Sequence, residues 1–272
     1  MSSLRKLHAV CGCLLFVSTT IMIGLVNKWP SYTPTIAAFS TNRTHVHTVE
    51  VDTTSTLLPV LLVVVGYISA FRHFIVFGLY NEDVFDAIIQ SRKNYLRWID
   101  YGITSPMMIV VIGILCGVVD VWVLYLIAVI QCVLMIASAV YEASESKQAI
   151  AMMFAVYMFG VWVPIFGTLS QQTPPTFVYI IVVVMCILFT SFGIVYTLKE
   201  TELISTVGAE ILYPVLSLTS KFQLQWLCYI GIGRSGDVGL GLVLGFGTIF
   251  GCALGVFAYK SIHFKSELLL NT

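Results

Sequence analysis

Apolar residues form eight long runs along the 272-residue chain, separated by shorter polar segments. A helix of about 20 apolar residues spans the hydrocarbon core of a bilayer, and each run approaches or exceeds that length. The pattern therefore predicts eight membrane-spanning helices. The expected spans are Leu4–Val26, Leu57–Tyr80, Asn94–Gly117, Val121–Tyr141, Gln148–Leu169, Thr176–Leu198, Ile204–Gly231 and a glycine-rich Leu240–Tyr259.

The composition agrees with a polytopic membrane protein. Hydrophobic residues make up 58% of the chain and charged residues 10%, whereas soluble domains have about 45–50% and about 25%. The expected fold class is an all-α bundle. The net charge of zero gives no indication of a nucleic-acid partner, and the seven cysteines lie in or beside apolar runs, as small buried side chains do. No nucleophile–base pair or metal-ligand cluster is evident, so we expect no enzymatic activity.

Basic residues set the expected orientation. With the N-terminus inside, the inner loop ends hold most of the Lys and Arg residues, and the outer side holds only Lys28, Arg43 and Arg234. This asymmetry predicts a cytoplasmic N-terminus. The long first connection contains the alternating segment Thr44–Asp52, which favours a short exposed strand or hairpin, with an irregular loop as the alternative.

Lys221 is the most unusual position in the apolar pattern, since it lies in the middle of the seventh run. A charged side chain near a bilayer centre costs roughly 2.5–3.5 kcal/mol on insertion scales and usually has a function. The comparably buried acid on another helix is Asp100. A buried amine with a buried carboxylate indicates a lysine Schiff base and its counterion. A local ion pair of Asp100 with Arg97, one turn away, is the alternative.

The neighbours of these two residues could complete a chromophore pocket. Ser217 lies one turn before Lys221 and could hydrogen-bond the Schiff base. Thr104, Met107 and Met108 follow on the Asp100 face and could line a flat polyene, although a packing stripe is as good an explanation. For Asp100 to reach the depth of Lys221, we expect the third helix to extend inward to about Val84.

Three further residues could form a proton network towards the cytoplasm. Glu210 precedes Lys221 by eleven residues, which places it on nearly the same helix face, about 16 Å further in. His73 lies beside Arg72 near the inner end of the second span, and imidazole titrates near neutral pH. Arg97 completes the set. A solvated Glu210 and a snorkelling His73 are the alternatives.

These residues together resemble the heliorhodopsin family. The resemblance rests on Arg97-Trp-Ile-Asp-Tyr101, on Glu210-Ile-Leu-Tyr-Pro-Val-Leu-Ser-Leu-Thr-Ser-Lys221, on the inward N-terminus and on His73. It implies a seven-helix retinal-binding domain over residues 1–231, with all-trans-retinal on Lys221, Asp100 as counterion, Ser217 beside the Schiff base, and a homodimer in the lipid bilayer. The family's usual counterion is glutamate, so Asp100 is a departure. Residues 232–272 would add an extra hydrophobic helix and tail.

Three functions remain open from the sequence. The first is a retinal photoreceptor that signals to an unidentified partner, and the second is light-driven or light-gated proton transport through Glu210. The third is a transporter that uses Asp100 and Lys221 without a chromophore. Adding retinal to the apoprotein separates the third from the others, and a photocurrent recording separates the first two.

Overall fold

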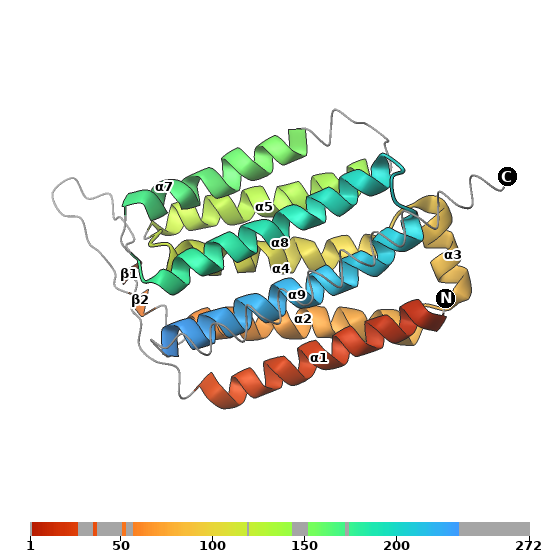
Figure 1. Cartoon of the computed structure of the whole chain (residues 1–272), viewed down its shortest axis with the longest axis horizontal. Helices are drawn as coiled ribbons and strands as arrows, with labels where there is room; N and C mark the ends of the chain where they lie inside the picture. The colour runs from red at the N-terminus through yellow and green to blue at the C-terminus, as the bar shows by residue number, and fades with distance from the viewer. Residues whose placement is uncertain are drawn as a thin grey trace.

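The computed structural model describes residues 2–26, 35–36, 51–52, 57–118, 120–142, 152–171 and 174–233. These residues form a bundle of seven long helices (Figure 1). The seven are α1 (Ser2–Val26), α2 (Leu58–Leu79), α4 (Tyr95–Leu115), α5 (Val121–Tyr141), a fifth span (Met152–Gln171), α8 (Thr176–Glu200) and α9 (Thr206–Gly233). They correspond to the first seven expected spans. The expected eighth span, Leu240–Tyr259, lies outside the described residues.

Six of these helices are long and apolar enough to cross a membrane, and α9 is the exception. Its middle carries Lys221, Gln223 and Gln225, which lower its hydropathy, but all three side chains are buried among the other helices. Large apolar side chains such as Trp122 and Val133 on α5 are exposed instead. The polar residues therefore face the inside of the bundle and the apolar ones face lipid, as expected for a membrane protein.

The helices pack in a ring in chain order. α1 packs on α2, α2 on α4, α4 on α5 and α5 on the fifth span, while α9 packs against α8, α1 and α2. Backbone contact is sparse between the fifth span and α8. The fifth span is also irregular, because it contains the π-helical segment η2 (Val156–Trp162) before α7 (Val163–Gln171). Wide turns of this kind often occur at functional sites.

The expected inward extension of the third helix is wrong. Residues Glu82–Ser91 form a separate helix, α3, at the end of the bundle where the chain begins (Figure 1). Arg92 has a left-handed backbone conformation, with φ of 58°, which ends α3. The Asn94 side chain then accepts a hydrogen bond from the Arg97 N–H and starts α4. Helical composition alone did not reveal this break.

The first connection contains two short antiparallel strands at the opposite end of the bundle (Figure 1). In this pair, β1 (Thr35–Ile36) bonds β2 (Val51–Asp52). The strand expected within Thr44–Asp52 is thus confirmed at its last two residues, with a partner that lies further upstream. Residues 37–50 lie outside the described part of the chain.

Candidate functional site

Lys221 and Asp100 lie together inside the bundle, as the sequence predicts. The Lys221 Nζ is 3.8 Å from Asp100 Oδ2 and donates a hydrogen bond of 2.9 Å to Ser217 Oγ, one turn earlier on α9. All three side chains are buried. A buried charge needs a partner of opposite sign, and here α9 supplies the amine while α4 supplies the carboxylate.

Asp100 is held from a third helix, α2. Ser69 Oγ donates to Asp100 Oδ1 at 2.6 Å, and Arg72 Nε lies 3.3 Å from Asp100 Oδ2. Arg72 is itself buried. The alternative pairing of Asp100 with Arg97 is therefore not what the structure has, since Arg97 points to other carboxylates. Nothing in the sequence indicates that Arg72 reaches this site, because no helical spacing relates α2 to α4.

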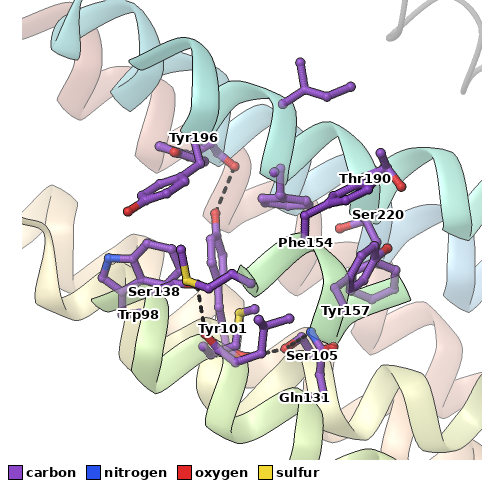
Figure 2. A pocket seen from close by; sticks show the side chains of 18 of the residues that line it. Trp98, Tyr101, Ser105, Gln131, Ser138, Phe154, Tyr157, Thr190, Tyr196 and Ser220 are labelled. Carbon is purple, nitrogen blue, oxygen red and sulfur yellow. Dashed lines mark hydrogen bonds between the residues drawn. The ribbon is translucent and has the colours of Figure 1, made fainter. Parts of the chain in front are cut away.

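A cavity of about 530 Å³ lies beside Lys221. Its walls come from α4, α5, the fifth span, α8 and α9, and they are mainly aromatic and aliphatic (Figure 2). The polar groups in the wall include Thr104, Ser105, Gln131 and Ser220. The aromatic residues that line it are Trp98, Tyr101, Phe154, Tyr157, Phe189, Phe192, Tyr196 and Tyr213. Such a cavity suits an apolar ligand with a few fixed polar contacts.

The three residues expected to line the chromophore pocket lie in different places. Thr104 and Met108 line the cavity, and Met107 instead packs against the main hydrophobic core. Thr104 Oγ1 donates a hydrogen bond to the backbone carbonyl of Asp100, one turn earlier on α4. The cavity wall includes the exposed side chains of Phe154 and Ile194, at the place where the fifth span and α8 make little backbone contact.

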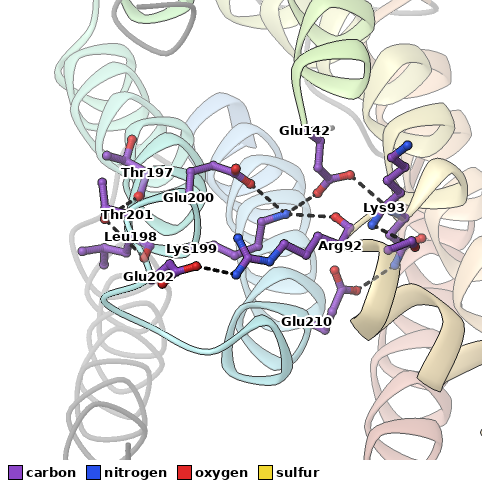
Figure 3. Close-up of polar contacts among 12 residues, drawn as sticks. Arg92, Lys93, Glu142, Thr197, Leu198, Lys199, Glu200, Thr201, Glu202 and Glu210 are labelled. Atoms are coloured by element: carbon purple, nitrogen blue, oxygen red, sulfur yellow. Dashed lines mark hydrogen bonds and ion pairs between the residues drawn. The ribbon is translucent and has the colours of Figure 1, made fainter. Parts of the chain in front are cut away.

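A second group of buried charges lies near the N-terminal end of α4 (Figure 3). Arg97 donates to both Glu142 and Glu210, and Asn94 Nδ2 donates to Glu210 Oε2 at 2.7 Å. Lys199 Nζ donates to Glu142 Oε1 at 2.6 Å and lies 3.2 Å from Glu200 Oε1. We call Arg97, Lys199, Glu142, Glu200 and Glu210 the inner charge cluster. It joins α4, α5, α8 and α9.

Glu142 is the centre of this cluster. It also accepts a hydrogen bond of 2.7 Å from Trp98 Nε1. Burial by itself would raise the pKa of the Glu142 carboxyl, but the charges of Arg97 and Lys199 outweigh burial and hold this pKa below its ordinary value. The sequence does not single out Glu142 or Lys199, because each lies at the end of a helix, where charged residues usually face solvent.

The expected proton network divides into two separate groups. Glu210 and Arg97 are in contact, as described above. His73 instead lies on the other side of Arg72, with its Nδ1 2.9 Å from Nδ1 of His8 on α1 and its Nε2 3.2 Å from Arg72 Nη2. A chain of contacts therefore runs from Lys221 through Asp100 and Arg72 to this histidine pair.

A sequence model of the heliorhodopsin family matches residues 4–232, which is most of the chain. The chain belongs to the heliorhodopsin family. It is thus an integral, multi-pass membrane protein of a family of retinal photoreceptors. No curated protein matches the chain.

Solved structures of other rhodopsins share this heliorhodopsin's fold. The transmembrane domain of the rhodopsin phosphodiesterase of Salpingoeca rosetta is 16% identical, with a TM-score of 0.64 over 84% of this chain and 83% of that chain. The light-driven proton pump LR (Mac) of Leptosphaeria maculans is 16% identical, with a TM-score of 0.61 over 85% and 94%. The thermophilic rhodopsin of Rubrobacter xylanophilus is 15% identical, with a TM-score of 0.60 over 87% and 99%. At these identities the likeness shows the fold alone.

The residues present fit retinal, the chromophore that the family implies. Lys221 is a wall residue of the cavity, so its amine is available to an aldehyde placed there. Asp100 beside it supplies the negative charge that a buried, protonated Schiff base needs. The aromatic walls from α4, the fifth span and α8 suit a long apolar polyene.

Proposed function

We propose that this heliorhodopsin binds all-trans-retinal as a protonated Schiff base on Lys221 and acts as a light sensor. The observation that carries the proposal is the position of the Lys221 amine, which lies at the wall of an apolar cavity and 3.8 Å from a buried carboxylate. Bound retinal supplies absorption of visible light and a light-driven change of its shape.

Each residue of the site has a physical role in this proposal. Asp100 stabilises the positive charge of the Schiff base as its counterion, and Ser69 fixes the orientation of the carboxylate. Ser217 Oγ accepts a hydrogen bond from the Lys221 nitrogen. The aromatic side chains around the cavity keep water away from the linkage, which strengthens the electrostatic interactions there.

The covalent linkage is tested by Lys221→Ala. Folded Lys221→Ala protein should show no visible band when retinal is added, because it lacks the amine. Lys6→Ala, which removes an exposed lysine of α1, should form the parent pigment. A normal pigment in Lys221→Ala would reject the linkage. The absence of a visible band in the parent protein would instead favour a transporter without a chromophore.

The counterion role is tested by Asp100→Asn. Excitation moves positive charge away from the Schiff-base nitrogen, and the negative charge of Asp100 opposes this movement. A neutral residue in its place should therefore shift the visible band to longer wavelength. The pH at which the visible band is lost should fall, since an opposite charge favours the charged form. A spectrum and titration equal to those of the parent would remove Asp100 from this role.

The structure gives a reason to prefer sensing over proton transport. Glu210 is the carboxylate proposed from the sequence as a proton station, and it is fixed by Arg97 and Asn94. A carboxylate fixed by an ion pair and a hydrogen bond cannot swing towards Lys221, which lies about 16 Å along α9. We therefore expect no photocurrent from the protein under voltage clamp across pH gradients. A pH-dependent photocurrent that Glu210→Gln abolishes would establish transport in place of sensing.

Orientation, oligomeric state and the C-terminal segment are further parts of the proposal. The basic residues at the inner loop ends support a cytoplasmic N-terminus. The family resemblance implies a homodimer, so we expect a dimer in lipid, and a signalling partner on one face. If the N-terminus is cytoplasmic, an epitope before Met1 should be reached by antibody only in permeabilised cells. The same holds for an epitope after Thr272 if residues 232–272 add an eighth span to the retinal-binding domain of residues 1–231. Labelling of the Thr272 epitope on intact cells would contradict the eighth span.

A further inference from the structure

Two buried cations share the carboxylate of Asp100. Oδ2 of Asp100 lies 3.3 Å from Arg72 Nε and 3.8 Å from Lys221 Nζ. Arg72, Asp100 and Lys221 are 4%, 2% and 2% exposed, so solvent screens none of the three charges well. Oδ1 is engaged by the hydroxyl of Ser69. A single carboxylate therefore faces two cations, and both lie nearest to the same oxygen atom.

We propose that Arg72 is a positioning residue that competes with the Schiff base for Asp100 and thereby tunes both the colour and the proton affinity of the pigment. This inference rests on the proposed retinal linkage at Lys221. Arg72 lies with its Nε 3.3 Å from Asp100 Oδ2 and places a second positive charge beside the linkage. Both effects weaken the electrostatic attraction between Asp100 and the Schiff base.

Among the described residues in direct contact with these three, none carries a negative charge that balances the second cation. Among the described residues, Asp100 is the carboxylate in contact with Lys221 and with Arg72. His8 and His73 face Arg72 from α1 and α2, and they have no negative form near neutral pH. Tyr101 of α4 lies with its ring 5.4 Å from Lys221 Nζ. About one turn towards the N-terminal end of α4, Arg97 pairs with both Glu142 and Glu210.

The geometry sets the size of the effect. Since Arg72 Nε and Lys221 Nζ contact the same oxygen at 3.3 and 3.8 Å, the two nitrogens lie at most about 7 Å apart. At an effective dielectric constant of about 20, a unit charge at about 7 Å changes proton affinity by about 50-fold. Removing the Arg72 charge should therefore raise the midpoint pH of Schiff-base deprotonation by between one and two units. It should also move the visible band to shorter wavelength.

The experiment compares three pigments with the parent in the dark. Arg72→Gln removes the charge and should give the shorter-wavelength band and the higher midpoint pH. Arg72→Lys keeps a cation at the position and should stay close to the parent in both measurements. Arg5→Gln is the control for loss of an arginine at the surface, where Arg5 donates to the Phe77 carbonyl, and it should leave the spectrum and titration unchanged.

The direction of the shifts separates tuning from a structural defect. Asp100→Asn should move the band to longer wavelength and the midpoint to lower pH, opposite to Arg72→Gln, and a loosened site would not produce opposite signs. Parent-like values in Arg72→Gln, or shifts in the Asp100→Asn direction, overturn the proposal. If Arg72→Gln forms no pigment, Arg72→Met takes its place. Failure of both neutral variants beside a normal Arg72→Lys assigns Arg72 to folding instead, and absence of pigment in the parent rejects the proposed function itself.

Discussion

Arg97 is the residue of the inner charge cluster whose loss should destabilise the protein most. Its guanidinium bonds Glu142 and Glu210, and its side chain is 1% exposed. Arg97→Met keeps much of the side-chain volume but removes the charge, which leaves two carboxylates buried without their shared partner. Removing one partner of a buried ion pair costs about 3–5 kcal/mol, because the other charge remains desolvated.

Arg92→Met is the matched comparison. Arg92 pairs with Glu202 at 2.7 Å, but these side chains are 34% and 63% exposed. Exposed pairs of this kind contribute about 0–1 kcal/mol. For a protein of this size, 1 kcal/mol corresponds to roughly 2–4 °C in melting temperature. We therefore expect a loss of about 6–20 °C for Arg97→Met and at most about 4 °C for Arg92→Met.

The assay is thermal unfolding of the retinal-free proteins in one detergent at one scan rate, since membrane-protein melting depends on the scan rate. The retinal-free state is chosen because bound chromophore would add its own stabilisation. Glu142 keeps Lys199 and Trp98 as partners, whereas Glu210 keeps the neutral amide of Asn94 and loses its Arg97 cation. Arg97→Met combined with Glu210→Gln should recover part of the loss. Equal melting temperatures for Arg97→Met and Arg92→Met would refute the stabilising role of the buried cluster.

Two further predictions concern packing and acid stability. Gly66→Ala places a methyl group against Thr19 of α1 and Gln225 of α9, so overpacking should cost about 1–3 kcal/mol of stability. Gly78→Ala on the same helix meets nothing within 4 Å and should leave the melting temperature unchanged or raise it. Equal effects of the two substitutions would contradict the packing argument. The lowered pKa of Glu142 means that its stabilising contribution is complete above the ordinary value of 4.5 and is lost as the pH falls through the lower folded-state pKa. The acid-induced drop in melting temperature should accordingly be smaller in Glu142→Gln than in the parent, and an identical pH profile in the two proteins would contradict it.

Features that depend on position along a single helix are the ones that the sequence predicts best. The spacing of Ser217 and Lys221 by one turn placed both on one face, and the structure confirms their hydrogen bond. The hydropathy runs located the seven described spans within a few residues, and the expected start of the fifth, Gln148, lies outside the described residues. The pairing of Lys221 with Asp100 also holds, because two buried charges of opposite sign in one bundle have a strong reason to meet.

The sequence could not predict contacts that depend on how helices are rotated against one another. We expected a long third helix to bring Asp100 to the depth of Lys221. Instead α3 ends at Arg92 and α4 begins at Tyr95, and Asp100 still lies 3.8 Å from Lys221. Arg72 and Lys199 lie near helix ends, where basic residues usually reach solvent. Both are buried against acids from other helices, and no pattern within α2 or α8 marks that.

The formal charges of the two buried groups complement each other. The proposed chromophore site holds Lys221 and Arg72 against Asp100, an excess of one positive charge. The inner charge cluster holds Arg97 and Lys199 against three glutamates, an excess of one negative charge. Asp100 and Arg97 are three residues apart on α4, so the two groups lie about one helical turn apart. At that separation in a weakly screened interior the excess charges attract, which gives a physical reason why a second cation is tolerated beside Lys221.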